Sequence, residues 1–348
     1  MIERLISSLN DIGKQTTWYQ SPDGSRVLLL GSGGRILGLF PPSSGENFIW
    51  TNPDLQDPKT AAAIYEGDGW HNSGGDRTWL APEVDIFFPD YPDVSRHWEP
   101  PQIDSDNYEI SQTPDECSLS KRLTLWLARP RQEVELELTK SVSAALNPLR
   151  REQGIELSSV EYAGYTLSTT FRVVRASGEG GFPLGIWNLL QLPHGGDMLV
   201  ALHSKTQPRV FFGSVPAKNL EVTDHLVKFK CDLEGEHKIA VRAAAVTGRA
   251  GYMWQSDGRW SLVIRNFFVN PSGDYVDCPA KDEKDLGYAF EAVNVNSALG
   301  KFCELEYHAP AITYPRSSKS HDLSQVWAFR GTLEAVRRIA HALLTPEL

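Results

Sequence analysis

Two glutamates and a histidine occupy alternate positions in the segment KFCELEYHAP (301–310). On a β-strand, alternate residues lie on one face, about 6.5–7 Å apart, so Glu304, Glu306 and His308 would point the same way. Carboxyl and imidazole groups can act as general acid and base because burial and neighbouring charges tune their pKa values. The same spacing also occurs on a solvated strand face, so this segment alone leaves both interpretations open.

A second segment, GWHNSGGDRTWLAPEVDIFFPD (69–90), joins a sharp Gly-Gly turn to charged and aromatic side chains. A guanidinium presents five donors in a planar fork that suits ring hydroxyls or a carboxylate. An indole offers an apolar face on which a sugar ring can stack. A structural turn with a salt bridge and a core tryptophan is the alternative interpretation. The candidate binding residues here are His71, Asp76, Arg77, Trp79 and Glu83.

A third segment, FPLGIWNLLQLPHGGD (182–197), has an apolar strand that carries Trp187, Asn188 and Gln191 and ends near His194. Amide and imidazole groups at the end of a buried strand can serve a pocket. The alternative is a capped strand end with a surface histidine before a turn.

Short strands must position these side chains, because most of the sequence alternates apolar and polar residues between turn signals. This period of two is typical of antiparallel strands with one buried face. The clearest predicted strands span 26–30, 35–40, 84–88, 122–128, 133–139, 164–175, 198–203, 237–243 and 260–269.

Two segments have helical periodicity instead, residues 2–12 and residues 332–344. Each places apolar side chains on one face, and Thr332 is suited to be the N-cap of the second helix. We expect each helix to cover part of a sheet, although the second could also bind a partner. Strand patterning continues through the Pro-rich loop 89–106, so we expect residues 1–348 to form one mainly β domain.

Composition excludes several classes of protein. The 348 residues carry 44 acidic and 34 basic side chains, a net charge of −10, and no basic stripe, so we expect no nucleic-acid partner. No apolar run approaches the ~20 residues that span a bilayer, and the N-terminus lacks a secretory core, so we expect a cytoplasmic protein without a membrane partner. Four dispersed cysteines and scattered histidines give no metal motif, and no phosphate or dinucleotide fingerprint occurs, so we expect neither metal nor cofactor.

Taken together, these segments resemble the galactose mutarotase-like superfamily, and its uncharacterised bacterial members more than the aldose 1-epimerases. The resemblance runs in order along most of the chain. It rests on the segments GSGGRILGLF, FIWTNPDL, GGDRTWLAPE, KSVSAALNPL, IELSSVEYAGY, IWNLLQLPHGG, WSLVIRNFFVNPSGDYVD and FCELEYHAPAITYP. It implies a large antiparallel β-supersandwich with short helices near both termini and a sugar on its concave face.

The resemblance also implies roles for individual residues. In that superfamily, a glutamate base and a histidine acid open and close the sugar ring. Glu304 matches the base, with Glu306 next on the same face, and Arg77 matches a sugar-binding arginine. His194 is the candidate acid, although it lies two residues beyond the matching position, which Leu192 occupies. We expect Trp187, Gln191 and His308 to contact the sugar.

Three functions therefore remain for a carbohydrate-active protein. Its ten tryptophans can stack on sugar rings, although packing in a large core accounts for most of the aromatic residues. The first is an epimerase-like isomerase that uses a Glu base and a His acid. The second is a glycoside hydrolase or polysaccharide lyase. It would need two carboxylates that face each other across a cleft, for example Glu304 on one side and either Glu83 or Asp76 on the other. The third is a non-catalytic sugar-binding protein. The partner in each case is a small carbohydrate, and the chain would act as a monomer or a homodimer.

Overall fold

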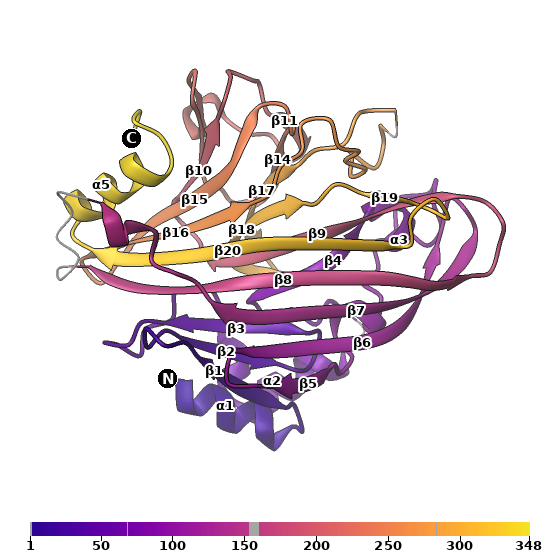
Figure 1. The fold of residues 1–348 in the computed structure, drawn as a ribbon, viewed down its shortest axis with the longest axis horizontal. Coiled ribbons are helices and arrows are strands. Elements are labelled where there is room, and N and C mark those ends of the chain that lie inside the picture. Colours follow the sequence, from indigo (N-terminus) through magenta and orange to yellow (C-terminus); the bar gives the residue numbers. More distant parts are fainter. Residues whose placement is uncertain (1, 68, 153–159, 283) are drawn as a thin grey trace.

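Two ten-stranded antiparallel sheets dominate the computed structural model, which describes residues 2–67, 69–152, 160–282 and 284–348 (Figure 1). The first sheet contains, in spatial order, β1 (Thr16–Gln20), β2 (Arg26–Leu30), β3 (Arg35–Phe40), β4 (Asp76–Ala81), β9 (Phe182–Pro193), β18 (Gly300–His308), β17 (Phe290–Ser297), β14 (Gly235–Val241) and β11 (Arg209–Phe212), with β19 (Ile312–Tyr314) paired to β9.

The second sheet crosses in front of the first in the view of Figure 1. It contains, in spatial order, β12 (Leu220–Val222), β13 (Leu226–Lys230), β10 (Asp197–Leu202), β15 (Val246–Ser256), β16 (Arg259–Phe267), β20 (Lys319–Gly331), β8 (Glu161–Ala176), β7 (Gln132–Ala144), β6 (Glu116–Leu127) and β5 (Glu109–Gln112).

A shared hydrophobic core joins the two sheets. Leu190 and Leu305 of the first sheet belong to the same buried cluster as Val263 and Val326 of the second. Because side chains alternate along a strand, the residues between these positions point to the opposite faces. The mainly β architecture confirms the predicted fold class.

The remaining elements are short helices. They are α1 (Ile2–Asp11), α2 (Pro58–Glu66), α3 (Glu83–Ile86), α4 (Pro101–Asp104), α5 (Leu333–Leu343) and the 3₁₀ turns η1 (Pro53–Gln56), η2 (Pro148–Arg151) and η4 (Ala217–Asn219). Across the described residues, every helix falls short of the length and apolar character that crossing a membrane would require.

The two predicted terminal helices cover outer faces of the sheets, one on each sheet (Figure 1). Leu5 and Leu9 of α1 pack in a cluster with residues of β2 and β3, and Val336 and Ile339 of α5 pack in another with residues of β16 and β20. The hydroxyl of Thr332 accepts a hydrogen bond from the amide of Ala335 at 3.2 Å, so Thr332 is the predicted N-cap. The terminal helices in the fold prediction are thus confirmed.

One segment differs from the sequence-based prediction, and a second lies partly outside the described residues. Residues 84–88 were expected to form a strand, but Glu83–Ile86 form the single turn of α3, because β4 ends at Ala81 and Pro82 begins the new element. Its apolar side chains pack into the core from a helical turn instead. The segment IELSSVEYAGY of the resemblance lies partly outside the described residues, at 155–159.

Three central strands of the first sheet bring distant segments together. β9 pairs with β4 on one side and β18 on the other, so Leu189 stands between Arg77 and Glu306 in register. The intervening residues Thr78 and Asn188 point toward the second sheet. Arg77, Leu189 and Glu306 therefore point away from it, onto the outer face of the first sheet.

Candidate functional site

A cavity of about 690 Å³ opens on this outer face of the first sheet. Its size lies within the roughly 300–1,000 Å³ of typical ligand pockets. Strands form its floor, and the loops around α3 and before β17 form its walls. Its lining is rich in aromatic and charged side chains: Trp70, Arg77, Trp79, Glu83, Phe88, His97, Trp98, Glu99, Trp187, Phe211, Phe212, Glu236, Lys238, Lys281, Phe302, Glu304 and Glu306.

The floor of the cavity holds Glu304 in a fixed position. Nη1 of Arg77 donates to Oε1 of Glu304 at 2.6 Å, and Nε2 of Gln191 donates to the same oxygen at 2.8 Å. Burial alone would raise the pKa of Glu304, but the Arg77 charge and these hydrogen bonds hold that pKa below its usual range. Glu304 is therefore a buried carboxylate that faces a cavity.

Two neighbouring tryptophans contact the Arg77 guanidinium. Its central carbon lies 4.1 Å from the ring centre of Trp79 and 5.0 Å from that of Trp70. Both indole N–H groups donate to Oδ1 of Asp104 at 3.3 Å, and Asp104 is itself paired with Arg35 at 2.7 Å. Asp104 thus positions the aromatic rings that position Arg77.

Glu306 sits beside Glu304 on the same face but in a different environment. Its Oε2 accepts from Nε1 of Trp187 at 3.1 Å and lies 3.3 Å from Nζ of Lys238. Burial, reinforced by the neighbouring carboxylates Glu304 and Glu291, raises the pKa of Glu306 well above its usual range despite Lys238. The two carboxyl groups therefore differ in their affinity for a proton, as an acid–base pair requires.

One wall of the cavity carries a second group of charges. Nε2 of His97 lies 3.3 Å from Oε1 of Glu83, and its Nδ1 lies 3.2 Å from Oε1 of Glu99. Burial would lower the pKa of His97, but these two glutamates raise it to about 9. The imidazole is therefore charged at neutral pH and ties α3 to the loop that follows it.

His308 lies on the same face as Glu304 and Glu306, as its spacing predicts, but outside the cavity lining. Its ring stacks on Trp187 with 5.2 Å between ring centres, and its Nε2 lies 3.3 Å from Oε2 of Glu291. It is buried beneath the cavity floor, with 1% of its surface exposed. A sugar in the cavity would meet Trp187 before His308.

Asp76 does not reach the cavity. It points between the two sheets, where its Oδ2 accepts from the Tyr165 hydroxyl and from Nη1 of Arg265, both at 2.5 Å. The residue is fully buried. Alternation along β4 explains the difference from the expected binding role, because Arg77 and Asp76 must point to opposite faces.

The structure also leaves His71 and His194 outside the cavity lining. Nε2 of His71 is bonded to the Gly67 carbonyl oxygen at 2.9 Å. Nε2 of His194 lies 3.1 Å from Oδ1 of Asn294, at the far end of β9. His194 is therefore not among the residues that line the cavity that Glu304 faces.

Several lining residues carried no usable signal in the sequence. Lys238 follows a histidine on a strand, a position that is normally solvent-exposed, and it is buried only because Glu291 and Glu306 surround its ammonium group. His97 and Trp98 fall in the Pro-rich loop, where no periodicity orients them. Trp70 lies in the second candidate segment together with Trp79, so its place in that segment is a signal for a role at the cavity.

Comparison with known proteins finds structural neighbours of this chain but no curated relative. No curated protein matches it. Among solved structures it is similar to HI1317 (9% identity over 90% of this chain and 99% of the other, TM-score 0.41). It is likewise similar to the GalM/aldose epimerase homologue from C. elegans, with 10% identity over 92% of this chain and 99% of the other and a TM-score of 0.39. A third similar structure is galactose 1-epimerase from Lactobacillus acidophilus NCFM, with 10% identity over 91% of this chain and 95% of the other and a TM-score of 0.41.

At the level of sequence, residues 36–348 match the model of a family of unknown function, DUF6786. Since that match covers nearly the whole chain, the protein described here belongs to the DUF6786 family.

Proposed function

We propose that this protein binds a small sugar in the aromatic cavity and interconverts its anomers, as an aldose-epimerase-like isomerase. The observation that carries the proposal is the Glu304 carboxylate, fixed by Arg77 and Gln191 on the floor of a tryptophan-lined cavity. Indole faces suit the apolar C–H faces of a sugar ring. The remaining guanidinium donors of Arg77 suit its hydroxyls.

In the proposed reaction, Glu304 takes the proton from the anomeric hydroxyl while the bond between the anomeric carbon and the ring oxygen breaks. A general acid gives a proton to that ring oxygen, and the open-chain aldehyde rotates before the steps reverse. Glu306 takes the acid role in place of His194, because its carboxyl lines the same cavity next to Glu304 whereas the His194 ring lies at Asn294. Trp187 and Lys238 orient this carboxyl.

Anomer exchange measured by NMR with a panel of aldoses tests this proposal. We expect Glu304→Gln and Glu306→Gln each to lower the exchange rate by about 10²–10⁴-fold, the usual contribution of a positioned acid or base. Glu133→Gln is the matched control, because Glu133 is exposed on β7 of the second sheet. If the wild-type protein accelerates exchange of no aldose, the isomerase proposal fails, and calorimetry then distinguishes sugar binding without turnover.

A glycoside hydrolase is the second candidate because carboxyl groups also line the loop side of the cavity. Glu83 and Glu99 lie there, whereas Glu304 and Glu306 lie on the sheet side. Hydrolysis needs two carboxyl groups on either side of the scissile bond. Release of a chromophore from aryl glycosides, abolished by Glu304→Gln and by Glu83→Gln, would favour hydrolysis over anomer exchange.

A further inference from the structure

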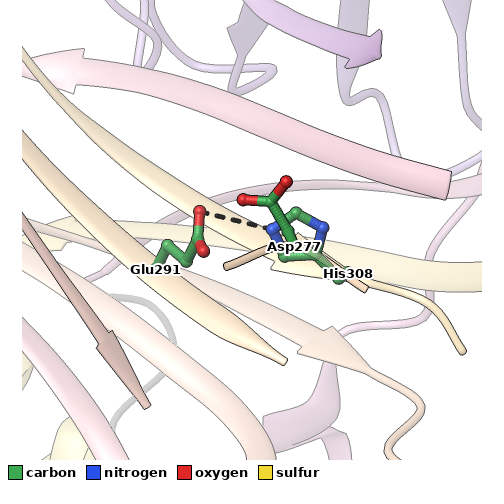
Figure 2. Close-up of side chains that lie close together, drawn as sticks. All are labelled: Asp277, Glu291 and His308. Carbon is green, nitrogen blue, oxygen red and sulfur yellow. Dashed lines mark ion pairs between the residues drawn. The ribbon is translucent and has the colours of Figure 1, made fainter. Parts of the chain in front are cut away.

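Three side chains of types that commonly bind metals lie close together beside the proposed sugar site. No sequence motif predicts this cluster. Glu291 lies at the start of β17, His308 at the end of β18, and Asp277 in the loop before β17. Figure 2 shows the three side chains pointing toward one another, with the ion pair between Glu291 and His308 dashed. One potential ligand atom from each lies within 4.8 Å of the other two.

The hydrogen-bonding capacity of these side chains is only partly used. Among the described residues, Oδ2 of Asp277, Oε1 of Glu291 and Nδ1 of His308 have no hydrogen-bond partner. All three residues are buried, with exposed fractions of 0%, 0% and 1%. Leaving a buried polar group without a partner costs about 1–3 kcal/mol, so native proteins rarely do so. Unpartnered atoms on three buried side chains that converge therefore indicate a missing ligand.

The local charge balance indicates that this ligand is a cation. Asp277 and Glu291 are buried carboxyl groups, and within the part of the chain that the structure describes the only lysine or arginine charge that contacts either of them is the ammonium of Lys238, 2.6 Å from Glu291. That ammonium is shared with Glu306, which lies 3.3 Å from it. The nearby Glu304 has its own cation in Arg77. Carboxylates buried without sufficient positive charge are costly, and a bound metal ion supplies that charge.

The geometry points to a divalent transition-metal ion, such as Zn²⁺ or Mn²⁺, bound by Asp277, Glu291 and His308. One imidazole and two carboxylates suit such an ion, whereas Ca²⁺ takes six to eight oxygen ligands. Ligand atoms held about 2.0–2.2 Å from one ion lie at most about 4.4 Å apart, so small side-chain rotations suffice. We propose this site in addition to the isomerase site and independently of it.

Neighbouring groups already orient two of these ligands, as the outer partners of metal sites do. The backbone N–H of Glu83 donates to Oδ1 of Asp277 at 2.7 Å, and the Trp187 ring stacks on His308. The loop that carries Asp277 continues into Pro279 and Lys281, which line the cavity. The ion would therefore fasten one wall of the sugar cavity to its floor.

Metal analysis of the purified, untagged protein tests the site. We expect about one Zn or Mn per chain by mass spectrometry, removal by a chelator, and restoration by ZnCl₂ or MnCl₂ with a rise in the unfolding temperature. Asp277→Asn and His308→Gln should each weaken the metal affinity at least about 100-fold, since even an outer partner is worth 10–100-fold. His321→Gln, at an exposed position on β20, is the matched control and should bind metal normally.

X-ray absorption spectroscopy of the Zn-loaded wild-type protein identifies the metal ligands directly. This measurement tests the site even if a variant fails to fold. It should show one imidazole nitrogen with oxygen ligands and no sulfur. Absence of metal after incubation with Zn²⁺ and with Mn²⁺, or equal binding by wild type and His308→Gln, would overturn the site. Glu304→Gln should lower the anomer exchange rate by about 10²–10⁴-fold yet retain the metal, so failure of one proposal can be told from failure of the other.

Discussion

Nη1 of Arg77 lies 2.6 Å from Oε1 of Glu304, although 227 positions separate the two residues in the sequence. Pairing of β4 and β18 with opposite edges of β9 produces this contact. Both side chains are nearly inaccessible to solvent, at 2% and 7% exposure. A buried ion pair at the floor of an open cavity fixes a carboxylate where a ligand can reach it.

Arg77→Lys should weaken sugar binding even though the charge is kept. Lysine is a point charge and cannot reproduce the planar fork that contacts Trp70 and Trp79. We expect a loss of about 1.5–3 kcal/mol, the worth of a hydrogen bond to a charged group, measured by calorimetry with the best sugar. Arg172→Lys on the exposed side of β8 is the control. Unchanged affinity would exclude Arg77 from the binding site.

Asp104→Asn should loosen the aromatic rings around Arg77 without touching the sugar. The substitution leaves the buried Arg35 without its ionic partner, so we expect a loss of about 3–5 kcal/mol in the free energy of unfolding. The near-ultraviolet circular dichroism of the tryptophans should change as well, since Trp70 and Trp79 both donate to Asp104. Asp106→Asn, at a half-exposed salt bridge, should alter neither quantity.

His97 should make the stability of the protein fall in mildly alkaline solution. Its pKa rises from the ordinary 6.5 to about 9 in the folded state, because Glu83 and Glu99 bind the charged ring. Its contribution is therefore full below about pH 6.5 and is lost as the pH rises through about 9. In denaturation curves, His97→Gln should be less stable than wild type at pH 6 and equally stable at pH 10. A difference that does not depend on pH would contradict this.

Asp76→Asn should affect stability and leave the sugar affinity of the folded protein unchanged. The buried pair between Asp76 and Arg265 lies between the sheets, and breaking such a pair costs about 3–5 kcal/mol. Chemical denaturation gives the first quantity and calorimetry below the transition gives the second. The exposed Asp54→Asn serves as the control and should leave both unchanged. Weaker sugar binding by Asp76→Asn would instead restore the binding role first expected for this residue.

Local periodicity was enough to predict which residues share a face of a strand. Period-two spacing correctly placed Glu304, Glu306 and His308 together on β18, and amphipathic periodicity correctly located α1 and α5. These features are local, because the geometry of a strand or helix fixes the direction of a side chain relative to its neighbours.

Tertiary structure decided which face meets the cavity and which partners arrive there. β9 is buried on both sides along nearly all of its length, so its sequence has no alternation that could separate Trp187 from Asn188 or exclude His194. The approach of Asp277 to Glu291, and of Lys238 to Glu306, depends on strand pairing and a loop crossing. Such contacts arise from packing over long sequence separations, which no short-range pattern encodes.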